Sequence, residues 1–185
     1  MLNRRHIRIK VLQAFYAFSQ SNNDDLVSGE KEFMHSMKKI YDLYIYLIQI
    51  YIPLKILANN KIEEAKRSFL EKDKYVFSKA FVSNIIIKSL ESSSQLKKTA
   101  ADLKINWEGL EENELIKKLY KSIYNSSSFQ DILKSEYSDF EEQKFHLITL
   151  FKEEICNFEL MHHFFYEKSI YWQDDLDHVS SMVIK

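Results

Sequence analysis

Hydrophobic residues recur at helical spacing along most of the chain, and near the N-terminus they form two neighbouring stripes within residues 3–20. The first stripe is Ile7, Val11, Ala14, Phe15 and Phe18, and the second is Ile9, Leu12 and Tyr16. This spacing predicts one α-helix with two apolar sides. We expect this helix to pack against two neighbours and to leave a polar strip made of His6, Lys10 and Gln13.

A second and longer helix is predicted after the polar connector at 19–25, with Ser28 as its expected N-cap. Its apolar residues step alternately by four and three, which is typical of helices that pack at shallow angles. They are Phe33, Met37, Ile40, Tyr44, Leu47 and Tyr51. Pro53 should kink or end this helix, because proline removes an internal hydrogen bond.

The middle of the chain predicts shorter helices. Apolar residues are sparse over 59–75, which indicates an exposed helical or irregular bridge, and a helix is predicted from Phe81 through the serines at 92–94 to Leu103. Gly109 marks a break before another helix at 115–123. The serines at 126–128 predict the cap of a helix that contains Ile132 and Leu133.

The last part of the chain predicts two helices. Ser138 and Glu141 form a capping-box pattern that opens a helix continuing through Phe158, and Asp174 begins the last helix. That last helix has an apolar stripe but no glycine cap before Lys185. We therefore expect a fragment of a longer protein or an end that varies among relatives; the alternative is an ordinary short helix docked on the body.

Composition supports an all-α fold. Only two glycines and one proline occur in 185 residues, whereas sheets and hairpins need many turn residues. With 45% hydrophobic and 14% aromatic residues, the chain can form one sizeable core or two small helical units.

The charge is unevenly distributed. Arg4, Arg5, Arg8 and Lys10 give residues 1–23 a charge of +4 with no acidic residue, whereas the whole chain carries −1. Cations at a helix N-terminus oppose the helix dipole unless an anion is present. Free backbone amides and arginines together suit phosphate, so the segment predicts a site for single-stranded RNA. The candidate RNA-binding residues are Arg4, Arg5, His6, Arg8, Lys10, Gln13 and Tyr16.

The sequence contains no pattern that indicates catalysis, a cofactor or a metal. Cys156 is the only cysteine, which excludes disulfide frameworks and is typical of a reducing cytoplasm. His162 and His163 point about 100° apart on a helix and are expected to be structural. We expect helix capping to explain the acidic residues at 174–177, and a buried helix rather than a membrane span to explain the apolar stretch at 43–57.

The opening string RRHIRIKVLQAFYAFSQSNND resembles the N-terminal helix of the bacterial NusB family, in which an arginine-rich start leads into a VLQALY-like core and a polar connector. A weaker similarity lies at 151–185, at FKEEI, NFELMHHFF and WQDDLDHVSSMVIK, where the second helical half of the family begins. The resemblance implies a NusB-like helical bundle with a long helical insert. The chain then divides into an arginine-rich helix and connector at 1–27, a helical body or insert at 28–140, and the start of a second half at 141–185.

The same resemblance implies a function without catalysis. It implies a cytoplasmic transcription antitermination factor that binds boxA-type RNA of nascent ribosomal transcripts. Its implied partner is a small-subunit ribosomal protein in the NusE role, and through it the RNA polymerase elongation complex. Two alternatives stay open: a NusB-like auxiliary domain of an RNA cytosine methyltransferase, and a helical scaffold that binds proteins but no RNA.

Overall fold

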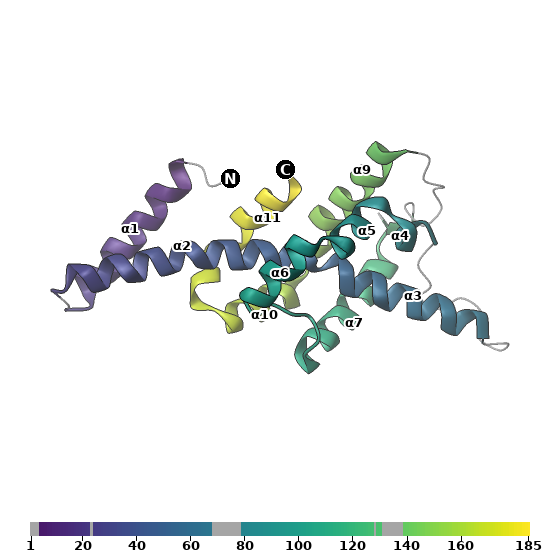
Figure 1. The fold of residues 1–185 in the computed structure, drawn as a ribbon, viewed down its shortest axis with the longest axis horizontal. Coiled ribbons are helices and arrows are strands. Elements are labelled where there is room, and N and C mark those ends of the chain that lie inside the picture. Colours follow the sequence, from purple (N-terminus) through teal and green to yellow (C-terminus); the bar gives the residue numbers. More distant parts are fainter. Residues whose placement is uncertain (1–3, 23, 68–78, 128, 131–138) are drawn as a thin grey trace.

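The computed structural model describes residues 4–22, 24–67, 79–127, 129–130 and 139–185, and each regular element in these ranges is a helix (Figure 1). The α-helices are α1 (Arg4–Gln20), α2 (Leu26–Gln49), α3 (Tyr51–Arg67), α4 (Lys79–Ser83), α5 (Ile85–Ser92), α6 (Ser94–Asp102), α7 (Leu110–Asn125), α9 (Phe140–Leu150), α10 (Glu159–Lys168) and α11 (Leu176–Ile184). A π-helical turn, η1 (Phe151–Ile155), and a 3-10 turn, η2 (Ile170–Trp172), complete the set. The predicted all-α class is confirmed.

Helices α2 and α3 follow one another end to end and form the long axis of the molecule (Figure 1). The break between them is at Ile50, and Pro53 lies in the first turn of α3. Backbone N–H groups in the first turn of a helix have no acceptor within that helix, so proline, which lacks this group, is tolerated there. The predicted interruption near Pro53 is therefore confirmed.

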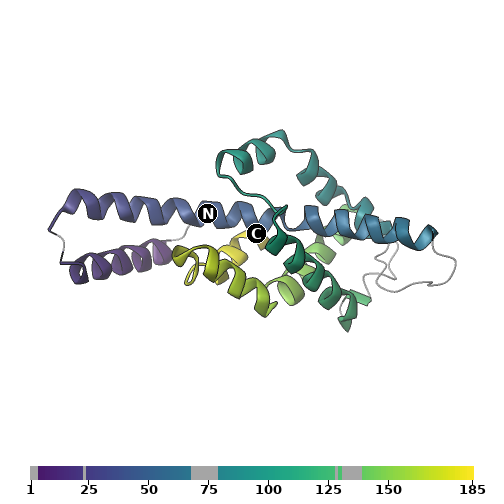
Figure 2. The ribbon, with the colours of Figure 1, turned by 90° about the horizontal axis from the view of Figure 1, so that it is seen from below.

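The core surrounds the second half of α2 and the start of α3. Leu43, Ile50 and Leu54 are completely buried there. Around this axis, α2 contacts α6, α11 and η2, and α3 contacts α5 and α7. The turn η1 contacts α7. By contrast, the first half of α2 projects from the body and carries α1 alongside it as an antiparallel hairpin (Figure 2).

An aromatic cluster anchors the turn that leads into α11. The indole N–H of Trp172 donates a hydrogen bond to the Lys39 carbonyl oxygen at 2.8 Å, and its ring meets Tyr46 edge-on at 5.9 Å between centroids. Tyr46 also packs edge-on against Phe165 and Trp107. Since Asp174 and Asp175 follow this turn directly, the cluster sets where their carboxylates lie.

Two helix starts differ from those expected. Asp25, rather than Ser28, is the N-cap of α2, because its carboxylate accepts a hydrogen bond from the Val27 amide at 3.0 Å. Asp139 caps α9 by accepting from the Glu142 amide, whereas Ser138 lies outside the described residues.

Two expected continuous helices are interrupted. Ser93 ends α5 and caps α6, so the serines at 92–94 separate two helices. The helix expected through Phe158 ends in the π turn η1, and α10 starts at Glu159. Gly109 does mark a helix boundary, at the N-cap of α7, and Ser126 accepts the Phe129 amide as expected of a cap. The expected residues Ile132 and Leu133 lie outside the described residues.

One stretch, Leu26–Arg67, is long and apolar enough by length and composition to cross a membrane. Its most apolar window is 56% buried inside the protein. The central helix of a water-soluble bundle has the same properties, so this feature is weak evidence for a membrane span.

Candidate nucleic-acid interface

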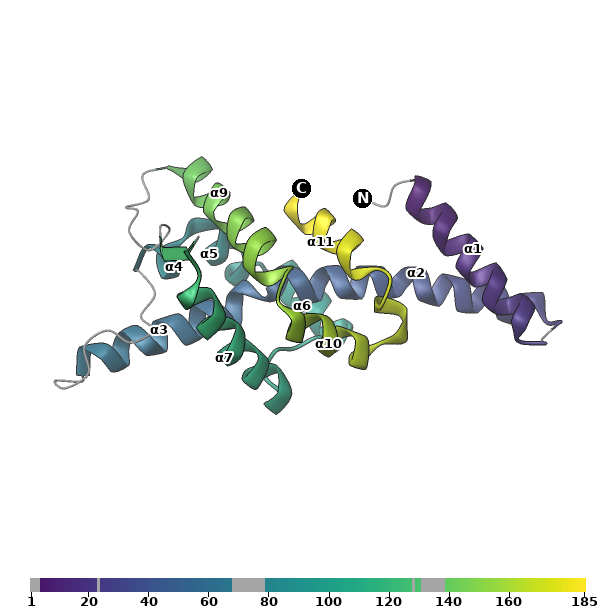
Figure 3. The same cartoon turned by 180° about the vertical axis from the view of Figure 1, so that it is seen from behind.

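Helix α1 is held against α2 by a close approach near the hairpin tip. A Cβ atom placed on Gly29 would come within 2.7 Å of the Phe18 ring, so only glycine lets this ring lie directly on the α2 backbone. The connector between the helices includes Asn22, whose φ is 50°. The contact brings α1 back along α2 and toward α11, and both lie on the same side of α2 (Figures 1 and 3).

The polar strip of α1 faces inward, onto the start of α11. The Lys10 ammonium lies 2.7 Å from one carboxylate oxygen of Asp175, and Nε2 of His6 lies 3.4 Å from the other. Lys10 and His6 are each 6% exposed, and Asp175 is fully buried. The half-buried Gln13 donates its amide to the Asp174 carboxylate at 3.0 Å. The expected polar strip thus binds acidic residues of this same chain.

His6 also stacks on His178 of α11. The ring centroids are 3.7 Å apart and the planes differ by 7°. Burial lowers the pKa of His6, and the neighbouring His178 and Lys10 lower it further while Asp175 opposes them. Burial likewise lowers the pKa of His178, again against the attraction of Asp175. Both rings are therefore neutral near pH 7, which lets two imidazoles stack without repulsion.

The three arginines of α1 face outward. Arg4, Arg5 and Arg8 are exposed, and none of them has an ion-pair partner among the described residues. Tyr16 is 66% exposed and, at 100° per residue, lies on the same outward side of the helix as these three residues. The structure therefore divides the candidate RNA-binding residues: Arg4, Arg5, Arg8 and Tyr16 share one exposed face, whereas His6 and Lys10 are buried and Gln13 is engaged by Asp174.

The expectation that two apolar stripes of α1 are buried is wrong. Phe15 and Leu12 are each 68% exposed, and Val11 is 48% exposed. The reason is that the buried carboxylate of Asp175 requires a counter-charge, and the Lys10 ammonium supplies it at 2.7 Å. Orienting Lys10 inward turns the apolar side of the same helix outward. The spacing of Phe15 predicts a core residue, and nothing in the local sequence distinguishes it from one.

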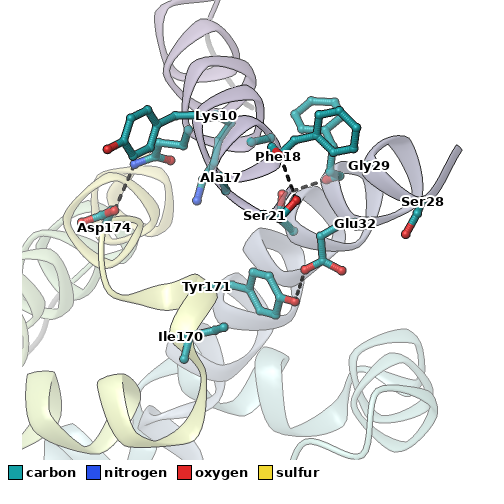
Figure 4. Close-up of a pocket in the computed structure, with 15 residues that line it drawn as sticks. Lys10, Ala17, Phe18, Ser21, Ser28, Gly29, Glu32, Ile170, Tyr171 and Asp174 are labelled. Atoms are coloured by element: carbon teal, nitrogen blue, oxygen red, sulfur yellow. Dashed lines mark hydrogen bonds between the residues drawn. The ribbon is translucent and has the colours of Figure 1, made fainter. Parts of the chain in front are cut away.

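A groove runs beside this helix, between α1, α2 and η2, with a volume of about 550 Å³ (Figure 4). Its lining includes the small residues Ala14, Ala17 and Ser28. The Tyr171 hydroxyl donates to the Glu32 carboxylate at one end, and Asp174 accepts from Gln13 at the other. The first of these hydrogen bonds ties η2 to α2, and the second ties the segment before α11 to α1.

The remaining chemical candidates are structural in this arrangement. Nε2 of His162 lies 2.7 Å from the Cys156 carbonyl oxygen, and the exposed His163 points toward Glu159. Burial raises the pKa of the half-buried Cys156 thiol, which disfavours the reactive thiolate. Within the described ranges no group of three His, Cys, Asp or Glu side chains is arranged to hold a metal ion. Asp175 is the N-cap residue of α11, but its carboxylate binds Lys10 and makes no side-chain cap hydrogen bond.

Comparison of the chain with family models, curated proteins and solved structures finds no match in any of the three.

Proposed function

We propose that this protein is a non-catalytic RNA-binding protein, and that the outward face of α1 is its RNA-binding surface. The observation that carries the proposal is that Arg4, Arg5 and Arg8 are exposed together at a helix N-terminus without a partner carboxylate among the described residues. Three exposed cations at a helix N-terminus repel one another and oppose the helix dipole, so an anion that bridges them is favoured.

A polynucleotide suits this face better than an isolated phosphate. A guanidinium fork binds phosphate oxygens in pairs, and Tyr16 on the same side offers an exposed ring on which a base can stack. Arginines close to an exposed ring are typical of sites that bind single-stranded RNA. The buried contacts of Lys10 and His6 assist by holding α1 in the one rotation that directs the arginines outward.

The resemblance of residues 3–23 to the NusB family extends this proposal to a specific RNA and partner. On that basis the RNA is a boxA-type element, the partner is a small-subunit ribosomal protein in the NusE role, and the setting is antitermination of ribosomal RNA transcription in the bacterial cytoplasm. Support for these finer statements comes from the resemblance alone.

The RNA-binding face is tested by the salt dependence of binding to a boxA-type single strand. Each phosphate contact contributes a slope of about 0.7 in log affinity against log salt for single strands. The variant Arg4/Arg5/Arg8→Ala should therefore flatten the slope by about two. A matched variant, Lys97/Lys98/Lys104→Ala, removes three exposed cations near α6 and should leave the slope nearly unchanged. Equal effects of the two triple variants would show that only net charge matters and would contradict the proposal.

A protein-binding scaffold is the second candidate, and the exposed Leu12 and Phe15 favour it. Single-stranded RNA and protein partners are distinguished by pull-down before and after ribonuclease treatment. Recovery of RNA together with the protein, lost in the triple arginine variant, supports the first function. Partners that are unchanged by ribonuclease, with no RNA recovered, support the scaffold.

A further inference from the structure

The outward side of the α1–α2 hairpin carries more exposed apolar surface than its RNA-binding role requires. Leu12 and Phe15 are each 68% exposed, and Leu26 and Val27 at the start of α2 are 75% and 58% exposed. A ring two-thirds exposed leaves on the order of 100 Å² in water. Contiguous apolar patches of a few hundred Å² on a protein surface mark contact sites with other molecules.

This side also contains a shallow hollow of about 210 Å³ along the seam between α1 and α2. Val11, Ala14 and Phe15 form one wall, and Leu26, Gly29 and Phe33 form the other. The Phe18 ring, which lies directly on the backbone of Gly29, also lines the hollow. Phe15 thus stands at the edge of a hollow that has room for an apolar side chain from another helix.

The charges along the hairpin have opposite signs at its two ends. Arg4 and Arg8 lie at the open end, where α1 begins. Asp24 lies in the connector at the tip, and Glu30 borders the hollow close to that tip. If two such hairpins pack antiparallel, the arginine end of each lies against the acidic end of the other.

We propose that the α1–α2 hairpin packs against the same hairpin of a second copy of this chain, in an antiparallel arrangement with two-fold symmetry. Phe15 of each copy enters the hollow of the other, and Arg8 of each faces Glu30 of the other. Because Phe15 and the hollow lie on the same side of the hairpin, both contacts form at once, as a two-fold interface requires. The product is a four-helix arrangement, the common way in which two amphipathic hairpins cover their apolar sides.

The available surface is appropriate for this pairing. A stable dimer buries roughly 800 Å² on each partner. Val11, Phe15 and Leu26, which line the hollow, are 48%, 68% and 75% exposed, and Leu12 and Val27 add further exposed apolar surface, so the apolar part of such an interface is already present. The charge pattern selects the antiparallel pairing, because parallel pairing would bring Arg4 and Arg8 of both copies together.

The proposal is tested by sedimentation velocity on RNA-free protein over a range of micromolar concentrations. We expect a monomer–dimer equilibrium, and Phe15→Glu should weaken dimerisation at least about 100-fold because a charge replaces a ring at the centre of the interface. Phe145→Glu is the matched control: Phe145 is a similarly exposed ring, 65% exposed, but lies on α9. It should leave the dimerisation constant unchanged. Circular dichroism establishes that each variant remains helical.

A charge exchange tests the orientation. Arg8→Glu and Glu30→Arg should each weaken the dimer roughly tenfold, since every dimer contains the pair twice, and the double variant should restore it. The proposal is overturned if the protein stays monomeric at every concentration, or if Phe15→Glu leaves the dimerisation constant unchanged. It is also overturned if the double variant dimerises no more tightly than the two single variants. Since no RNA is present, the result is independent of whether α1 binds RNA, although both interactions use the same arginines.

Discussion

The variant Asp175→Asn probes the contact on which the rotation of α1 depends. It keeps the shape of the side chain but removes the charge that faces the Lys10 ammonium at 2.7 Å, and both groups are almost fully buried. Removing one member of a buried ion pair leaves the other charge without compensation, at a cost of about 3–5 kcal/mol. If α1 detaches from α11 in the variant, Lys10 becomes solvated again, and this limits the cost to the lower part of the range.

We therefore expect Asp175→Asn to lower the free energy of unfolding by about 3 kcal/mol, which corresponds to a fall in Tm of about 6–12 °C for a chain of this size. Urea unfolding and calorimetry measure the loss. Amide hydrogen exchange shows its location, and protection should fall in α1 while the core of α2 around Leu43 stays protected.

Two further variants make this prediction specific. Asp174→Asn alters the neighbouring carboxylate, which accepts the Gln13 amide near the protein surface, and should change stability by less than about 0.5 kcal/mol. The double variant Lys10→Met/Asp175→Asn should be at least about 1 kcal/mol more stable than the sum of the single effects, because it removes both charges. A loss below about 1 kcal/mol for Asp175→Asn, with unchanged exchange in α1, would refute the reasoning.

Two other predictions concern the same helix. Because the pKa values of His6 and His178 lie below the ordinary value of about 6.5, the unfolded chain binds more protons than the folded one as the pH falls through 6.5. Their contribution to stability is therefore complete above that pH and decreases below it; exchange in α1, corrected for its intrinsic pH dependence, should be faster at about pH 5.5 than at about pH 7.5. In His178→Phe the difference in α1 exchange rate between the two pH values should be smaller. A difference as large as in the unaltered protein would show that other groups cause the pH dependence. For Gly29→Ala, the added methyl group meets Phe18 at 2.7 Å, so α1 should lose protection by roughly 1–3 kcal/mol despite the better helix propensity of alanine. Equal or greater protection in Gly29→Ala would show that the ring moves aside freely.

The helical class and most helix positions could be predicted from sequence, since they depend on local properties. Apolar spacing locates α1, α2 and α7, and Gly109 and Ser126 mark boundaries through their own backbone or hydroxyl chemistry. Exact caps were less predictable where two candidates compete. Asp25 and Ser28 both suit the start of α2, and in the structure it is the Asp25 carboxylate that accepts the Val27 amide.

The candidate site was only partly predictable for a different reason. The sequence by itself determined that α1 begins with a cluster of cations and that Arg4, Arg5 and Arg8 share a helix with Tyr16. Only the tertiary structure decided which side of α1 faces the protein. That choice depends on Asp175, 165 positions from Lys10 along the chain, because burying a carboxylate is stable only when a cation is brought to it. Periodicity ranks the sides of a helix by hydrophobicity, but a distant buried charge can outweigh that ranking, and here it turns apolar residues outward.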